Sequence, residues 1–388
     1  MDAVSLRPKI PALTSLRFFA ALHVLLFHTG AMGAVFGPTW FQRLSGIGYT
    51  GVSFFFVLSG FILVYTYSGR PTSAKAFWGA RFARVYPAYA FALLISLPFF
   101  LWGAAHFAEI GVPFMAFEAA HTKIAAALEI FLLQSWVPPA ALSWNAVGWS
   151  LSVEAFFYLL FPFLLTRFER LSRTQLLCVI TLCWVVSNAI SGSYAVFHPD
   201  GVLHPDGYTA TSWIQFVKFF PMVRLPEFLM GMATGILFLR SSRNARLAAP
   251  LVLGGLLAVG LVAAFANRLP YIVIHTALLS PAFAALVYGI ALRPKWAGIL
   301  EARLPVLLGD SSYSMYLIHA NIVFQFFHTS KGAVRNANFT GLALCLGIVV
   351  LFSMLIFKFI EEPARRKLRP KPKTELNWKP QATTAANV

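Results

Sequence analysis

The sequence predicts an all-α protein that crosses a membrane about ten times, with both termini in the cytoplasm. Of its 388 residues, 58% are hydrophobic and only 12% are charged, whereas roughly a quarter are charged in soluble domains. Apolar runs of about 20 residues, the length that crosses the hydrocarbon of a bilayer, recur along the chain. Lysine and arginine gather in alternate loops. These observations exclude a soluble globule and predict one transmembrane domain over residues 1–370, followed by a disordered basic cytoplasmic tail over 371–388.

Ten apolar runs account for most of the chain. They cover residues 11–30, 46–66, 86–105, 149–166, 174–192, 213–239, 247–266, 271–292, 304–327 and 338–360. The first run has some features of a cleavable signal peptide, but the spans that follow it favour a retained helix. The shorter run 124–136 would place the basic residues 167–173 outside if it crossed, so we expect an interfacial or re-entrant segment.

The basic residues predict the orientation. If the N-terminus is cytoplasmic, the outer loops carry only Arg43, Lys123, Arg268, Lys331 and Arg335. The remaining loops and the tail hold most of the lysines and arginines, as cytoplasmic segments do. The net charge of +17 therefore reflects topology and does not predict a nucleic-acid partner.

The three cysteines give no sign of a metal site or a disulfide. Cys178, Cys183 and Cys345 all lie inside apolar runs, where we expect small buried apolar side chains. The chain has no nucleophile elbow, P-loop or Cys/His metal spacing. The sequence therefore predicts neither a metal nor a permanently bound cofactor.

The longest polar outer loop, residues 191–212, contains two turn signals, His198-Pro-Asp-Gly and His204-Pro-Asp-Gly. They are typical of paired turns, and a contact with an acceptor substrate is the alternative.

Ionisable residues inside spans are candidates for function because their burial in lipid is costly. Arg17 and His28 are eleven residues apart, so they share one helix face and lie ~16 Å apart along the axis. This spacing suits acyl-coenzyme A, with phosphates near Arg17 and the thioester near His28. An uncharged imidazole is the form that acts as a general base toward a hydroxyl. The alternative is that His28 caps or hydrogen-bonds a neighbouring helix.

Arg81 and Arg84 form a second cationic pair just before Tyr86-Pro87. We expect Pro87 in the first turn of the third span, so that two arginines flank a helix N-terminus and can bind phosphate. Ordinary anchoring at the cytoplasmic surface is the alternative.

Glu154 follows Trp149 near the outer end of the fourth span and needs a polar partner. Arg224 and Glu227, at i and i+3 on either side of Pro226, are the candidates for it. A purely structural ion pair remains the alternative.

Seven segments, taken in chain order, resemble the acyltransferase 3 family of integral membrane proteins. They are Ser15–His28 with its Arg-x10-His pattern, Gly51–Phe61, Arg81–Pro87, Trp149–Tyr158, Arg224–Gly231, Ser312–His319 and Glu361–Pro363. The fifth is similar to members that act in exopolysaccharide production. Ser53 departs from the pattern, because many members have aspartate there.

The resemblance implies an acyl-CoA donor that enters from the cytoplasm and a hydroxyl acceptor on the far side of the membrane. By the resemblance, His28 would be the catalytic base, and Arg17, Arg81 and Arg84 would bind the donor. Glu154, Arg224 and His319 carry over as acceptor-side or structural groups. The expected site therefore has His28 and Glu154 as catalytic residues, and its acceptor-binding residues are Trp149, Arg224, Glu227 and His319.

The expected function is therefore a bacterial inner-membrane O-acyltransferase that moves an acyl group, most simply acetyl from acetyl-CoA, to a surface glycan, an exopolysaccharide or a lipid-linked saccharide. A transporter of an acylated glycan or lipid intermediate is the alternative, and a scaffold for a polysaccharide synthase leaves the buried histidine and arginine unexplained. The identity of the acceptor, the acyl chain, the oligomeric state, and the choice between direct transfer and an acyl-histidine stay open.

Overall fold

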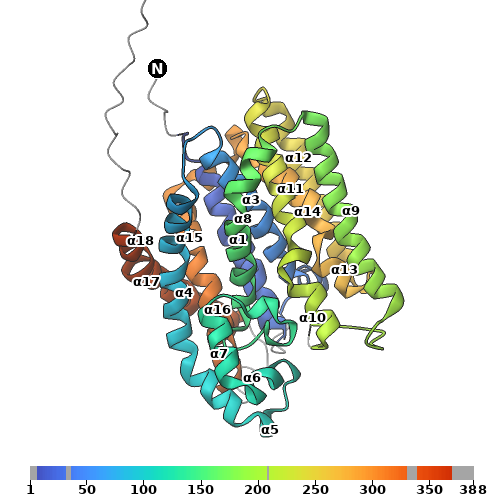
Figure 1. Ribbon diagram of the computed structural model, residues 1–388, viewed down its shortest axis with the longest axis vertical. Coiled ribbons are helices and arrows are strands. Elements are labelled where there is room, and N and C mark those ends of the chain that lie inside the picture. Colours follow the sequence, from blue (N-terminus) through green and yellow to red (C-terminus); the bar gives the residue numbers. More distant parts are fainter. Residues whose placement is uncertain (1–6, 32–35, 208, 330–338, 369–388) are drawn as a thin grey trace, which may run out of the picture.

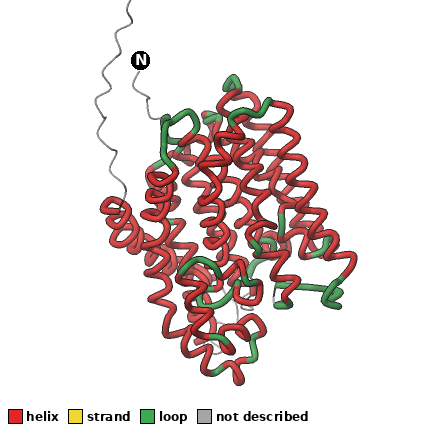
Figure 2. Tube along the Cα trace, in the orientation of Figure 1, coloured by secondary structure: helices red, strands yellow, loops and turns green. Residues whose placement is uncertain are grey.

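The protein is a bundle of helices that run up and down between two ends (Figures 1 and 2). The computed structural model describes residues 7–31, 36–207, 209–329 and 339–368, and every regular element in these ranges is a helix. The fold class predicted from the sequence is confirmed. The tail predicted over 371–388 and the outer-loop residues Lys331 and Arg335 lie outside the described residues.

Within the described ranges, eight helical segments are long and apolar enough to cross a membrane. They are Pro11–Ala31, Gly48–Tyr67, Ala74–Ala105, Ala146–Phe168, Arg173–Phe197, Ser212–Arg240, Ala245–Arg268 and Phe339–Leu368. A ninth is formed by Ala277–Ala291 and Lys295–Glu301 if that pair, bent by 95°, counts as one span.

Two of the ten predicted spans are broken. The expected span 271–292 is divided into α13 (Tyr271–His275), a turn of 3₁₀ helix and α14 (Ser280–Ala291). The expected span 304–327 is divided into α15 (Arg303–Asp310) and α16 (Ser312–Thr329). Two serines, two tyrosines and two histidines lie along α16, so it is less apolar than the helices that are long and apolar enough to cross a membrane.

The third span begins well before the predicted residue. The Ser73 hydroxyl accepts a hydrogen bond from the backbone N–H of Ala76, and this cap starts α4 (Ala74–Ala105). Pro87 therefore lies inside α4, and Arg81 and Arg84 project from its second and third turns. The prediction that they flank a helix N-terminus is wrong, because the Ser73 cap starts the helix well before the predicted apolar run.

α3 (Gly51–Tyr67) lies at the centre of the bundle beside α11 (Pro221–Arg240). A Cβ on Gly231 would lie 2.0 Å from the Val57 carbonyl oxygen, and one on Gly60 would lie 2.3 Å from the Phe228 carbonyl oxygen. Only glycine allows this backbone contact, a common way for membrane helices to pack closely. α1 (Pro11–Ala31), α8 (Trp149–Phe168) and α14 also pack against α3.

The helices alternate in direction, so their connections fall at two ends. One end of the bundle lies at the top of Figure 1, and α1, α4, α9 (Arg173–Phe197) and α12 (Ala248–Phe265) all begin there. We call it the basic end. Its connections contain Arg70, Arg170, Arg243 and Arg293. The opposite end carries α5 (Phe107–Ile110), α6 (Ala116–Ala120), α7 (Thr122–Ile130) and α10 (Ser212–Phe219). That the basic end faces the cytoplasm stays a prediction.

The segment 124–136, predicted to be interfacial or re-entrant, overlaps α7. This helix has nine residues and is too short to span a membrane. Cys183 and Cys345 are buried, but Cys178 is exposed on α9, so the prediction that all three are buried is wrong for Cys178. Its apolar surroundings are compatible with a lipid-facing position.

Glu118, in the segment at the opposite end, is expected to make the stability of the protein depend on pH. Its Oε2 accepts a 2.7 Å hydrogen bond from the Trp144 backbone N–H. Burial raises the pKa of Glu118 to about 7, and that hydrogen bond opposes the rise. Between pH 4.5 and 7 the folded protein holds this proton more tightly than the unfolded chain does. The free energy of unfolding should therefore fall as the pH rises through this window, and Glu118→Gln should remove this part of the fall. Thermal unfolding of the native protein and of Glu118→Gln, measured in detergent from pH 5 to 8, tests this prediction. It would be contradicted if stability changed equally with pH in the two proteins.

Candidate active site

A cavity inside the bundle joins the residues predicted to bind the donor. Arg17 from α1, Arg81 and Arg84 from α4, and Glu154 from α8 all line it, together with residues of α3 and α16. It encloses about 870 Å³, including its open mouth. Four predicted site residues that are far apart in the sequence are thus brought to one space.

Most of the charged side chains that line the cavity are cationic. The Arg81 guanidinium lies 5.8 Å from the Tyr67 ring centroid and 5.9 Å from that of Tyr158. Its Nη2 donates a long 3.4 Å hydrogen bond to the Tyr67 hydroxyl, and no described residue pairs with its buried Nε. Arg17 and Arg84 lie close enough to Glu361 to interact electrostatically. Three guanidinium groups against the single carboxylate of the lining suit an anionic ligand.

Glu154 has partners different from those predicted. Its Oε1 accepts a 3.0 Å hydrogen bond from the Ser59 hydroxyl and a 2.5 Å hydrogen bond from the Tyr158 hydroxyl. The prediction that Arg224 and Glu227 supply the partner is wrong, because they pair with each other deeper in the bundle. Tyr158 lies one helical turn after Glu154, so the spacing offered a signal that the sequence reasoning did not use.

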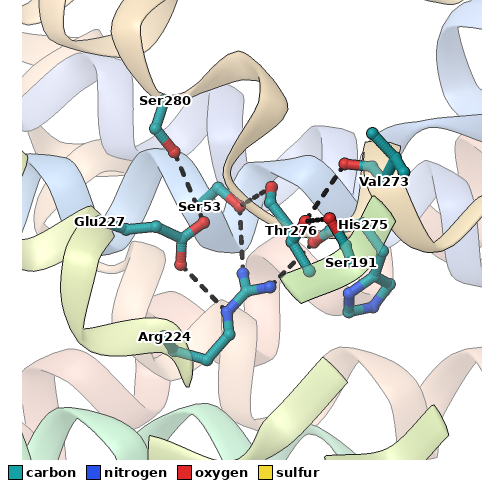
Figure 3. Close-up of polar contacts among 8 residues, drawn as sticks. All are labelled: Ser53, Ser191, Arg224, Glu227, Val273, His275, Thr276 and Ser280. Carbon is teal, nitrogen blue, oxygen red and sulfur yellow. Dashed lines mark hydrogen bonds and ion pairs between the residues drawn. The ribbon is translucent and has the colours of Figure 1, made fainter. Parts of the chain in front are cut away.

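The Arg224–Glu227 pair is the centre of a buried polar network (Figure 3). Arg224 Nε lies 3.0 Å from Glu227 Oε2, and each side chain is only 1% exposed. The other guanidinium nitrogens donate to the His275 carbonyl oxygen at 2.9 Å and to Ser53 Oγ at 3.1 Å. Ser53, where many family members have aspartate, thus offers Arg224 a neutral acceptor, and Glu227 supplies the carboxylate. Trp149 packs against the Arg224 guanidinium, 5.6 Å from its ring centroid.

Breaking this pair should destabilise the fold. Arg224→Met leaves the buried Glu227 carboxylate without its cation, and loss of one partner of such a pair typically costs about 3–5 kcal/mol. Glu227→Gln should have a similar effect, because it leaves Arg224 without its carboxylate. The double variant Arg224→Met/Glu227→Met should lose less than either single one, since no unpaired charge remains. Denaturant unfolding in mixed micelles measures all three; single variants within about 1 kcal/mol of the native protein would contradict a structural role.

His28 lies against His319 rather than in the cavity lining. The His28 Nδ1 is 2.9 Å from the Val24 carbonyl oxygen and 3.2 Å from His319 Nε2. The His319 Nδ1 is 2.7 Å from the Tyr316 carbonyl oxygen, and His319 is fully buried. The ring centroids of the two histidines are 4.9 Å apart.

The hydrogen bonds assign one proton arrangement to this pair. His319 Nδ1 carries a proton because it must donate to the Tyr316 carbonyl, so Nε2 of neutral His319 is an acceptor. His28 Nδ1–H is then shared between the Val24 carbonyl and His319 Nε2. This leaves the lone pair of His28 on Nε2, which no described residue hydrogen-bonds. The pair therefore holds His28 in the tautomer whose Nε2 can accept a proton.

The pair lies directly behind the cavity wall. Tyr316 lines the cavity, and its ring centroid is 5.6 Å from that of His319. Arg17 lines the cavity and His28 does not, so the cavity as it stands reaches Arg17 and stops short of His28.

Several residues at the site were missed from the sequence. Tyr158, Tyr313 and Tyr316 line the cavity, and buried Glu361 accepts a 2.9 Å hydrogen bond from Ser314 beside it. All of them fall within segments that carry the family resemblance, which was the available signal. Among the described residues, no group of three or more His, Cys, Asp or Glu side chains is placed to hold a metal.

Comparison with known proteins agrees with these features. A family model described as an acyltransferase domain matches residues 10–358. Acyltransferase MdmB of Streptomyces mycarofaciens is 27% identical over 387 residues, covering 93% of this chain and 92% of that protein. O-acetyltransferase OatA of Staphylococcus aureus is 30% identical over 191 residues, covering 45% of this chain and 28% of OatA. No solved structure matches.

Proposed function

Because the chain belongs to the acyltransferase 3 family, we propose that it is an O-acyltransferase that moves an acyl group, most simply acetyl, from acyl-CoA to a hydroxyl of a bacterial glycan. The observation that carries the proposal is the cavity in which Arg17, Arg81 and Arg84 meet, with His28 and His319 behind its wall.

The cavity is the proposed donor site. The phosphates of acyl-CoA carry several negative charges, and arginine is well suited to hold them because its planar fork can bind two phosphate oxygens. Tyr67 and Tyr158 keep the Arg81 guanidinium in the cavity wall. The pantetheine arm is long and slender, and it would extend from the arginines past Tyr316 toward His28.

His28 is the proposed general base. Its Nε2 accepts the proton of the acceptor hydroxyl as the oxygen attacks the thioester carbonyl carbon. A C–O bond forms, the C–S bond breaks, and the CoA sulfur leaves as a thiolate that takes up a proton. His319 accepts the Nδ1–H of His28 and so orients the ring. Glu154 is the second proposed catalytic group, because it is the carboxylate of the cavity lining.

The acceptor side and the location of the protein are also proposals. We place the basic end in the cytoplasm of a bacterial inner membrane and the acceptor at the opposite end, as a surface glycan, an exopolysaccharide or a lipid-linked saccharide. The relatives MdmB and OatA, named as acyltransferase and O-acetyltransferase, support the reaction class. The role we propose on this side for Trp149, Arg224 and Glu227 is indirect. Because the ion pair is buried, these residues would shape the bundle around the acceptor and would not contact it.

The direct test uses purified protein, acetyl-labelled CoA and glycan fractions as acceptors. The proposal predicts label on the glycan and free CoA in equal amounts, both dependent on Arg81. A transporter would bind its cargo without breaking the thioester. Binding of acyl-CoA with no transfer to any acceptor would contradict the proposal.

A further inference from the structure

Lys218 is a buried cation that no described residue neutralises. It lies near the end of α10, and its side chain is 2% exposed. Its ammonium lies 5.0 Å from the Phe219 ring centroid and 5.3 Å from that of Tyr271. No described residue accepts a hydrogen bond from it or forms an ion pair with it, although Asp206 attracts it over a longer distance. Such an ammonium is costly to bury, above all in a membrane protein.

The groups around Lys218 also have unused hydrogen-bonding capacity. The Tyr49 and His275 rings stack 5.1 Å apart, and Tyr271 contacts both rings. The buried His275 Nδ1 has no hydrogen-bond partner among the described residues, and neither the Tyr49 nor the Tyr271 hydroxyl makes a hydrogen bond to one. In Figure 3 no dashed line reaches the imidazole of His275, although its backbone belongs to the Arg224 network. Lys218, His275, Tyr49 and Tyr271 form what we call the Lys218 cluster.

The other buried cation of this region shows that the cluster is unusual. Arg224 has a carboxylate, a carbonyl and a hydroxyl as partners. The guanidinium of Arg224 therefore has partners within hydrogen-bond distance, whereas the ammonium of Lys218 has only the longer-range attraction of Asp206. Methionine would fill a similar volume without the cost of a charge, so packing alone does not explain a lysine here.

The position of the cluster connects it to the proposed base. The Phe27 ring centroid is 5.1 Å from that of Tyr49 and 5.2 Å from that of His28. α10 and α13 lie at the end of the bundle opposite the basic end (Figure 1). At that end the outer loop covers the cluster, since a Cβ on Gly207 would lie 3.8 Å from the Tyr271 hydroxyl.

We propose that the Lys218 cluster is an acceptor subsite that binds an oxyanion carried by the glycan, either a phosphate or a sugar carboxylate. The ammonium and the tyrosine hydroxyls donate hydrogen bonds to the anion, and the aromatic faces pack against the attached sugar. This inference rests on the proposed function, because it assigns the cluster to the acceptor of that reaction. The ligand displaces the contact between the loop at Gly207 and Tyr271 as it enters.

Binding of simple anions tests the site independently of catalysis. Inorganic phosphate and glucuronate are each titrated against the native protein, Lys218→Met and Lys218→Arg, with the thermal midpoint as readout. We expect stabilisation of the native protein by at least one anion, its loss in Lys218→Met and its partial recovery in Lys218→Arg. The anion that stabilises identifies phosphate or carboxylate. Arg268→Met is the matched control, because Arg268 is also an outer-end cation over an aromatic ring, 5.5 Å from that of Phe265.

Transfer kinetics complete the test. Lys218→Met should raise the KM for an anionic acceptor about ten- to a hundredfold, the loss expected for charge-assisted hydrogen bonds, with donor affinity unchanged. A neutral acceptor analogue should be unaffected. Equal anion stabilisation in the native protein and Lys218→Met, or a less stable Lys218→Met with unchanged acceptor KM, would overturn the inference. If the native protein transfers no acyl group, the proposed function fails, and the anion titration still decides whether the site exists.

Discussion

Replacing His28 with alanine is expected to reduce acyl transfer by roughly 10²- to 10⁴-fold while acyl-CoA still binds. The geometry gives the reason, since His319 and Val24 hold the Nδ1–H and leave the Nε2 lone pair for the acceptor proton. Removal of a general base slows the chemical step and leaves ground-state binding intact. Single-turnover transfer and equilibrium binding of acyl-CoA, measured on the same preparation, separate the two effects.

Two further variants make this result specific. His23→Ala is the matched control, because it removes another imidazole of α1, whose Nε2 contacts the Leu44 carbonyl, and it should leave transfer nearly unchanged. His319→Gln should cost less than His319→Ala, since a glutamine carbonyl can still accept the Nδ1–H of His28; one such hydrogen bond is worth up to about tenfold in rate. If His28→Ala kept more than about a tenth of the native rate, the base would have to be sought elsewhere, with Glu154 and His319 next.

Replacing Arg81 with alanine should weaken acyl-CoA binding by about 1.5–3 kcal/mol, or roughly 10- to 150-fold. The side chain lies in the cavity wall and forms an ion pair with no described residue, so its loss should remove the proposed phosphate contact without leaving a described carboxylate unpaired. Arg81→Lys should recover only part of the affinity, because lysine cannot form the bidentate fork or stack as arginine does on Tyr67 and Tyr158. Isothermal titration with a non-hydrolysable acyl-CoA analogue measures the change.

Arg240→Ala is the control for charge alone. Arg240 also lies at the basic end, but it donates to the Leu171 and Glu169 carbonyls and does not line the cavity. Its loss should leave donor affinity within about twofold, well below the effect of one hydrogen bond. Equal affinities for the native protein, Arg81→Ala and Arg240→Ala would show that Arg81 serves only to anchor the helix at the membrane surface.

The fold was predicted correctly where the length of an apolar run determines a span. It was mispredicted where polar side chains determine where a helix starts or breaks. Eight spans have counterparts in the apolar runs, because a run of about 20 apolar residues has few alternatives in a bilayer. The start of α4 was missed because Arg81 and Arg84 face a cavity, so the helix extends past its apolar part. The breaks near Thr276 and Ser311 depend on packing against other helices, which hydropathy does not report.

The candidate site was predictable where it follows one helix or one motif. Arg17, Arg81 and Arg84 were chosen from helical spacing and the resemblance, and the structure brings them to one cavity. The contact between His28 and His319 joins residues 291 positions apart, which no local pattern reveals. The partner of Glu154 was misassigned because Arg224 offered the right charge, while the hydroxyls of Ser59 and Tyr158 are neutral donors that charge counting overlooks. Lys218 belongs to no motif; as an ionisable residue inside a predicted span it was one candidate among several, and it stands out in the structure because no described residue pairs with its ammonium.

We propose that the donor enters at the basic end of the bundle and the acceptor at the opposite end. Proteoliposomes with acyl-CoA confined to one side and glycan acceptor to the other test this arrangement, with the orientation of the protein read from labelling of His204→Cys. Acyl transfer is expected only when the donor is on the side of Arg81, and it should be lost in His28→Ala. Equal transfer with the donor confined to the side of His204 would contradict it.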